Sequence, residues 1–365
     1  MVTLADILRQ HGPAYREKYG AKMLPSHWQA MRAIEQCRTP ALGGHVYRCP
    51  DCQDDNYRYH SCRNRHCPQC QHQTGQQWLE MQQALLLPVP TFLLTFTLPA
   101  ALRPLARGNQ RLLYDLLFRS AAAATQILAQ DPRFVGGKIG MVGVLHTWGR
   151  NLSYHPHVHF LVPAGGWDSA SQSWLPGKHN FFVPVKALSP IFRARFRDAL
   201  RGSDLFGAVP TETWTDDWVV HCKPVGDGRA ALRYLAPYIF RVAISNRRII
   251  KLADGQVTFR YRETDTGRWR TCQLSAEQFI HRFLQHVLPK GFVKVRYYGL
   301  FASCNRHRLT AIRQQMDEAT TDPHRATVAP DTATSEPPSC PTCGRQMQLL
   351  KRVPRGVPPR PWHPP

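Results

Sequence analysis

Two pairs of cysteines in the first fifth of the chain have the spacing of zinc ligands. Cys49 and Cys52 lie in C-P-D-C, and Cys67 and Cys70 lie in C-P-Q-C. Four thiolates from two such pairs can surround a tetrahedral Zn²⁺ ion, and this spacing is typical of zinc ribbons. The residues around them include few aliphatic side chains, so a metal would supply stability that a hydrophobic core does not. We therefore predict one structural zinc site made of these four cysteines.

The spacing leaves the roles of several other ligand-type residues open. Those in the same stretch could form a second site or exchange with the first, namely Cys37, His45, Cys62 and His66. A third C-x-x-C pair, Cys340 and Cys343, stands near the C-terminus with no second pair beside it. It could borrow Cys304 or His307, or bind no metal.

A second chemical pattern is made of histidines and tyrosines. His157 and His159 flank Val158 in H-P-H-V-H-F, and residues two apart in a strand point to the same face. Two neutral imidazoles there suit a divalent cation, although such a pair also occurs as hydrogen-bonded core. Tyr234 and Tyr238 in R-Y-L-A-P-Y share one face if the segment is helical. Phenols beside a metal that polarises a phosphate can attack a phosphodiester, whereas the alternative for these tyrosines is simple packing.

The elements that would position these side chains are mixed rather than strictly alternating, which favours an α+β domain. Strands are predicted over 91–99, 138–148, 155–166, 218–225 and 291–299, with helices over 110–130, 189–202 and 275–289. Asp254 and Gly255 predict the turn of a hairpin over 249–263. The uncharged stretch 84–102 contains three prolines and reads as a buried strand, so we expect no membrane span.

The charge of the chain indicates its partner. Lys and Arg number 47 against 25 Asp and Glu, which gives a net charge of +22. Such a surplus creates a positive field whose natural partner is a polyanion, most often nucleic acid. The first residues lack the charged start and apolar run of an export signal, so the cysteines are expected to be metal ligands in a reducing cytoplasm.

The combination of motifs resembles a known family. The pieces run in order along the chain as SCRNRHCPQC, TFLLTFTLP, VLHTWGRNLSYHPHVHFLVPAGG, YLAPYIFRVAISNRRI, HVLPKGFVKVRYYG and CPTCG. This set resembles the two-tyrosine branch of the HUH endonucleases, and closely the rolling-circle transposases of the insertion-sequence-91 type. The resemblance covers roughly residues 20 to 310 and the terminal knuckle.

The resemblance implies a fold and an activity. The fold would be an N-terminal zinc ribbon followed by an HUH-type antiparallel sheet flanked by helices. The activity would be nicking and joining of single DNA strands through a 5′-phosphotyrosine link, without ATP or another nucleotide cofactor. Tyr234 and Tyr238 match the nucleophiles, and Pro237 between them leaves room for one dominant nucleophile, for which Tyr234 is slightly favoured. His157 and His159 match the ligands of Mg²⁺ or Mn²⁺, with His146 as the candidate third ligand and His155 as the alternative.

The expected organisation follows from these matches. Residues 1–36 form a helical lead-in, 37–75 the zinc-binding ribbon, 76–312 the HUH domain, and 313–365 a disordered basic tail with the C-x-x-C knuckle. Arg63 and Arg65 on the ribbon loop are predicted to contact DNA, which is expected to be the single-stranded or hairpin ends of a mobile element. The expected location is the bacterial cytoplasm, associated with the nucleoid.

Two alternatives remain for the function. The first is a replication initiator or relaxase with the same HUH chemistry, although no helicase or Walker motif is present. The second is a zinc-dependent DNA-binding protein without catalysis, in which the histidines and tyrosines are structural.

Overall fold

The computed structural model describes residues 2–70, 72–240, 243–263, 266–318 and 337–356. It has the predicted α+β class, with antiparallel pairing between neighbouring strands throughout these residues. The largest sheet has five strands in the order β12-β4-β5-β3-β8. Their bounds are β3 Thr91–Thr97, β4 Gly140–Trp148, β5 Tyr154–Pro163, β8 Val220–Pro224 and β12 Val295–Gly299. All five strands were predicted from the sequence.

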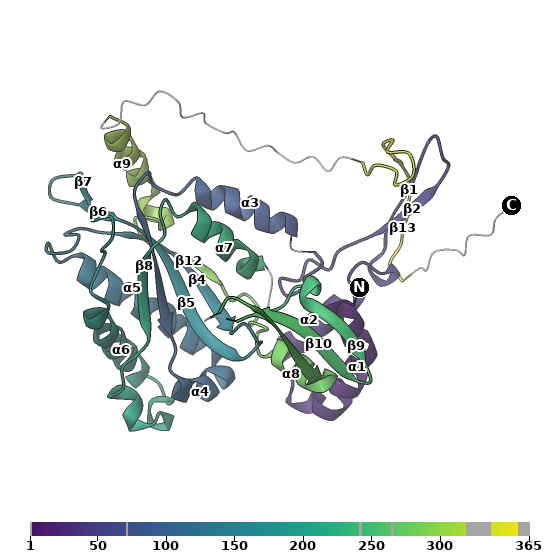
Figure 1. The fold of residues 1–365 in the computed structure, drawn as a ribbon, viewed down its shortest axis with the longest axis horizontal. Helices are drawn as coiled ribbons and strands as arrows, with labels where there is room; N and C mark the ends of the chain where they lie inside the picture. The colour runs from purple at the N-terminus through teal and green to yellow at the C-terminus, as the bar shows by residue number, and fades with distance from the viewer. Residues whose placement is uncertain (1, 71, 241–242, 264–265, 319–336, 357–365) are drawn as a thin grey trace.

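Helices cover both faces of this central sheet, because its middle strands are apolar on both sides (Figure 1). On one face lie α4 Arg103–Gly108, α5 Gln110–Ala129 and α6 Val185–Arg201, which pack on a cluster of phenylalanines. Gly143 of β4 lies against this cluster. A Cβ atom at Gly143 would lie 2.6 Å from the ring of Phe160, so only glycine leaves room for that ring. The opposite face meets α3 His72–Gln83 and α7 Arg229–Phe240. Two short strands, β6 Gly165–Asp168 and β7 Ser173–Pro176, and the helix α9 Arg306–Glu318 lie at one end.

Beside the central sheet lies a second core that joins distant parts of the chain. It contains α1 Leu4–Tyr19, α2 Pro25–Gln36, α8 Ala276–Leu284 and the sheet of β9 Ile249–Ala253, β10 Gln256–Arg262 and β11 Trp269–Ser275. The hairpin at Asp254 is confirmed. The predicted helix over 275–289 begins at the cap residue Ser275, whose hydroxyl accepts a hydrogen bond from the Gln278 amide. The N-terminal helices are therefore not a separate lead-in, because they share a hydrophobic core with residues that the sequence places in the catalytic domain.

A third sheet stands away from both cores (Figure 1). The hairpin of β1 Gly44–Arg48 and β2 Asp55–Tyr59 is joined by β13 Gln348–Val353, which pairs with β1. The tail was expected to be disordered from residue 313, yet α9 continues to Glu318 and residues 337–356 form a knuckle and a strand. Composition alone missed this order because the strand gains its pairing from β1, which lies 300 or more positions earlier in the chain, as the pair Arg48 and Gln348 shows. The rest of the predicted tail, 319–336 and 357–365, lies outside the described residues.

The uncharged stretch 84–102 contains the buried strand β3, as predicted. Among the described residues, no helix has the length and apolar character needed to cross a membrane.

Candidate functional site

Three histidines gather on one face of the central sheet. His157 and His159 alternate along β5, and His146 of β4 is the direct cross-strand neighbour of His157. One ring nitrogen from each imidazole lies within 4.8 Å of the others. The ring centroids of His146 and His159 are 4.5 Å apart, and those of His157 and His159 are 4.8 Å apart. The structure thus brings together the predicted pair and the predicted third residue.

His155, the alternative third residue, is not part of this group. Its ring centroid is 5.2 Å from that of His157, but no nitrogen of His155 joins the three-nitrogen cluster. It lies one step further along β5, towards the open edge of the site. The two central strands β4 and β5 therefore supply all three converging imidazoles.

Hydrogen bonds orient two of the rings. Nδ1 of His157 lies 2.7 Å from the carbonyl oxygen of His155, which can only accept, so Nδ1 carries the proton. The lone pair of His157 is then on Nε2, where a metal can bind. Nδ1 of His159 lies 2.8 Å from the hydroxyl of Thr95, its cross-strand neighbour on β3. Partners of this kind fix the orientation of imidazole ligands.

Burial keeps the three imidazoles neutral. Desolvation lowers the pKa of His157 to about 4, and it lowers the pKa of His146 and of His159 well below the ordinary value. His159 and His157 also disfavour a charge on His146, and His157 disfavours a charge on His159. Neutral imidazoles keep their lone pairs at physiological pH, so this donor set fits a divalent transition-metal ion.

A cleft of about 670 Å³ opens beside the histidines on the same face of the sheet. Thr95, Thr97 and His157 line its floor, together with His221 of β8, whose cross-strand neighbour is Thr95. Arg103 contributes a positive charge at its wall, and Asp216 and Asp217 contribute negative charges. Of the histidine cluster, His157 therefore borders an open cleft of a size suited to a nucleotide.

The helix α7 carries both predicted nucleophiles. Leu232 and Leu235 of α7 pack on Val144 of β4, on the face of the sheet that carries the histidines. Tyr234 is 47% exposed on this helix. Tyr238 lies within α7, four residues on, but its side chain is outside the described part of the structure. Pro237 does not end the helix, which continues to Phe240.

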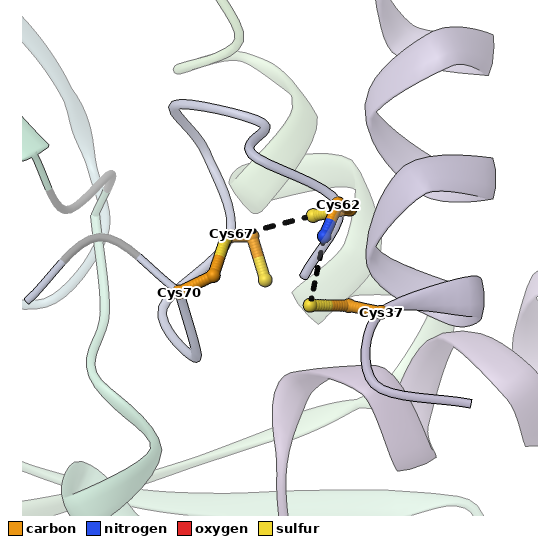
Figure 2. Close-up of side chains that lie close together, drawn as sticks. All are labelled: Cys37, Cys62, Cys67 and Cys70. Carbon is orange, nitrogen blue, oxygen red and sulfur yellow. Dashed lines mark hydrogen bonds between the residues drawn. The ribbon is translucent and has the colours of Figure 1, made fainter. Parts of the chain in front are cut away.

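The four-cysteine site predicted from the two N-terminal pairs does not form. Cys67 and Cys70 instead meet Cys37 and Cys62, with the Cys62 and Cys70 sulfurs 3.7 Å apart (Figure 2). The reason is the hairpin between the two pairs. Cys49 lies at the tip of β1–β2, whereas Cys67 follows the hairpin base, and strands of five residues span roughly 15 Å.

The first cluster is tied to the end of α2. Cys37 is the C-cap residue of that helix, and its sulfur accepts a hydrogen bond from the Cys62 amide at 3.5 Å. The Cys62 sulfur accepts another from the Asn64 amide, also at 3.5 Å. Four thiols with amide donors around them match the chemistry of a closed tetrahedral zinc site. His66 is buried nearby and belongs to neither cysteine cluster.

The second cluster joins the two ends of the chain. Cys49 and Cys52 meet Cys340 and Cys343, with the sulfurs of Cys49 and Cys343 3.5 Å apart. Neither Cys304 nor His307 takes part, contrary to one of the options that spacing left open.

The two arginines of the first knuckle have different surroundings. Arg65 donates a hydrogen bond of 2.6 Å to the Phe292 carbonyl, so its side chain is directed towards the core of the protein. Arg63 is exposed at a positive φ of 51°. Contact with DNA therefore remains a prediction for Arg63, whereas Arg65 fixes the knuckle to the segment before β12.

Comparisons with known proteins agree with this arrangement. Residues 140–308 match a family described as "Putative transposase", and residues 7–98 match one described as "Transposase zinc-binding domain". The chain is 40% identical over 334 residues to "Putative transposase y4qJ" of Sinorhizobium fredii, which covers 86% of this chain and 83% of that protein. It belongs to the transposase family of insertion sequences 91 and 801. It is also 31% identical to "Transposase for insertion sequence element IS801" of Pseudomonas savastanoi pv. phaseolicola, over 85% of this chain and 80% of that one.

Membership in this family makes DNA the partner of the transposase and DNA cleavage its general activity. The matched zinc-binding domain and the cysteine clusters support structural zinc. The three histidines and Tyr234 lie within residues 140–308 of the first match. No solved structure matches the chain.

Two residues beside the histidine cluster escaped the sequence analysis. Thr95 is one of several threonines in a strand, and only strand register identifies it as the partner of His159. Lys294 is buried with its ammonium 4.7 Å from the Trp148 ring, and desolvation lowers its pKa to about 7. A weak signal existed for the second, since Lys294 stands between two valines in V-K-V, directly before β12.

Proposed function

We propose that this transposase nicks and joins single DNA strands through a covalent 5′-phosphotyrosine intermediate, in rolling-circle-type transposition. The observation that carries the proposal is that three neutral imidazoles lie on the same sheet face on which the helix with Tyr234 and Tyr238 packs. A metal-ligand set, an open cleft and a phenol-bearing helix on one sheet face are the parts that phosphodiester attack by tyrosine requires.

The chemistry of the protein's own residues follows from this placement. A tyrosine of α7 loses its phenolic proton, and its oxygen forms a bond to phosphorus while the bond from phosphorus to the 3′ oxygen breaks. The leaving oxygen takes up a proton and becomes a 3′-hydroxyl. Joining is the reverse reaction, in which a 3′-hydroxyl attacks the phosphotyrosine, so the bond energy is conserved and no nucleotide cofactor is needed.

His146, His157 and His159 would hold the divalent ion. When bound, such an ion polarises the phosphate and offsets the negative charge that develops on it. The donor set consists of three nitrogens, which suits Mn²⁺ better than Mg²⁺, an ion that prefers oxygen ligands. We therefore expect activity with both ions and half-maximal activity at a lower concentration of Mn²⁺.

The substrate we propose is single-stranded or hairpin DNA from the ends of the element. The transposase would act on this DNA in the cytoplasm, at the nucleoid. The cleft at the histidines admits a nucleotide, whereas the covering helices α3 and α7 leave less room for a continuous duplex over the sheet. The net charge of +22 supplies general affinity for phosphates.

A nicking assay tests the proposal. Labelled single-stranded oligonucleotides carrying the element end would be incubated with Mn²⁺ or Mg²⁺ and separated on a denaturing protein gel. The same assay would use Tyr234→Phe, Tyr238→Phe and the double variant, with Tyr261→Phe on β10 as a matched control in the other sheet. We expect a covalent protein–DNA band that is lost in the double variant and after metal chelation, and is kept in the control.

The outcome also separates the alternatives. DNA binding without a covalent band under either metal would refute the tyrosine chemistry and favour a zinc-dependent DNA-binding protein. Nicking at a plasmid origin but not at an element end would favour a replication initiator or relaxase.

A further inference from the structure

The C-x-x-C pair near the C-terminus forms the same turn as the pair at the tip of the hairpin. The Cys49 amide donates to the Asp54 carbonyl at 3.0 Å, and the Gln53 amide donates to the Cys49 carbonyl at 3.1 Å. In the tail, the Cys340 amide donates to the Arg345 carbonyl at 2.8 Å, and the Gly344 amide donates to the Cys340 carbonyl at 2.9 Å.

The backbone dihedrals repeat as well. The residue after the second cysteine has a positive φ in both turns, 57° at Gln53 and 77° at Gly344. Gln53 is not glycine, so its left-handed conformation carries a cost that the surrounding contacts must offset. Two copies of one turn, from opposite ends of the chain, thus present their sulfurs to each other.

The four sulfurs lie within 4.8 Å of one another, in the range that one tetrahedral ion can bridge. The Cys52 amide donates to the Cys49 sulfur at 3.4 Å, which supports a thiolate. The sulfur of Cys49 is 3.5 Å from that of Cys343, well beyond the length of a disulfide of about 2.05 Å. The arrangement is that of a closed metal site rather than of cross-linked cysteines.

Apart from the pairing of β13 with β1, few contacts hold the tail to the hairpin. Among the described tail residues 337–356, only Pro338 and Met347 are buried besides Cys340. The pairing adds an exposed ion pair between Arg345 and Asp51 at 2.7 Å and a hydrogen bond from Thr342 to Asp54 at 3.1 Å. Exposed ion pairs contribute little to stability, and β13 is exposed along most of its length. Two buried side chains and a strand pairing on the surface offset little of the entropy of ordering residues 337–356. An additional source of stability is required.

We propose that Cys49, Cys52, Cys340 and Cys343 bind a second structural Zn²⁺ ion, which completes a split zinc ribbon from both ends of the chain. The matched zinc-binding family ends at residue 98, so it does not include the tail half of this site. The first ion, at Cys37, Cys62, Cys67 and Cys70, is separate. The ribbon therefore depends on a strand and a knuckle that lie outside both matched regions.

Zinc content of the purified full-length protein tests the proposal. Zinc per chain would be measured by inductively coupled plasma mass spectrometry for the parent protein and for the double variant Cys340→Ser/Cys343→Ser. We expect the double variant to bind one zinc ion fewer. The difference is the measured quantity, because the histidine cluster can also take up zinc. Cys304→Ser, an exposed cysteine outside both clusters, is the matched control and should retain the parent content.

A second measurement covers the case of a variant that folds poorly. Lys351 and Arg352 lie in β13, so trypsin should cleave there slowly in the parent protein and at least tenfold faster after Cys340→Ser/Cys343→Ser or after chelation. Equal zinc content in parent and double variant would overturn the proposal, as would a disulfide between Cys49 and Cys343 in the purified protein. Neither measurement involves DNA cleavage, so failure here is distinct from failure of the proposed nicking activity.

Discussion

Replacement of Thr95 by valine tests the reasoning about the histidine cluster. Valine has nearly the shape of threonine, so packing in β3 is kept while the hydroxyl that meets Nδ1 of His159 at 2.8 Å is lost. His159 is buried, and an imidazole N–H left without a partner there costs about 1–3 kcal/mol. The ring can avoid this cost by turning or by moving its proton to Nε2, and either change removes the lone pair from the metal.

We expect Thr95→Val to weaken metal binding as much as the removal of other residues that orient metal ligands does. Their removal weakens metal binding by about 10- to 100-fold, which corresponds to about 1.4–2.7 kcal/mol. We therefore expect the Mn²⁺ concentration for half-maximal nicking to rise by that factor in Thr95→Val, with most of the maximal rate recovered at saturating metal.

The chain offers a matched control on the same strand. Thr97 is a buried threonine of β3 on the same face as the half-buried Thr95, and it is the cross-strand neighbour of His157 as Thr95 is of His159. His157 instead donates its orienting hydrogen bond to the backbone carbonyl of His155. Thr97→Val should therefore leave the Mn²⁺ requirement within about twofold of the parent. Equal shifts in the two variants, or no shift in Thr95→Val, would refute the assigned role of the hydroxyl.

Three further outcomes are expected. His146→Ala should raise the Mn²⁺ concentration required for nicking by at least tenfold, whereas His155→Ala should change it by less than threefold. A larger increase in His155→Ala than in His146→Ala would make His155 the third metal ligand instead. Lys294→Met should stabilise the protein by roughly 3 kcal/mol at pH 7. The reason is that burial lowers the pKa of Lys294 from 10.5 to about 7. The buried lysine therefore lowers the free energy of unfolding most below pH 7, and less as the pH rises. The gain in melting temperature should therefore shrink at pH 9, and a gain that is constant with pH would contradict the assigned pKa. Gly299→Ala should destabilise the fold by about 3 kcal/mol or more, since φ is 58° and the added methyl would overlap the Ile139 carbonyl oxygen; an unchanged thermal melt would show that β12 adapts.

The central fold and the histidine cluster were predictable because their signals are local. Strands such as 91–97 are apolar over their whole length, and the alternation of His157 and His159 requires only that the segment be a strand. His146 needed one more step, the pairing of β4 with β5. A short connection between two predicted strands makes them antiparallel neighbours, and that pairing places His146 opposite His157.

The cysteine assignment failed because ligand spacing carries no information on long-range topology. Cys67 and Cys70 pair with cysteines before and after the hairpin, so the nearest C-x-x-C in sequence is not the nearest in space. The shared core of the N-terminal helices with residues 243–287 was likewise beyond sequence reasoning, because apolar faces reveal that a helix is buried but not its partner.

The pairing of β13 with β1 sets an order of events on the ribosome. Cys49 and Cys343 are 294 residues apart, and at roughly 5–20 residues per second the first emerges tens of seconds before the second is made. During that interval the tip of the hairpin has neither its third strand nor the other half of its sulfur cluster. A nonsense or frameshift mutation between residues 300 and 340 would leave that hairpin incomplete while sparing all five strands of the central sheet. The complete ribbon thus forms only after β13 has been made, and such truncated copies would be distinguished from longer ones at the protein level.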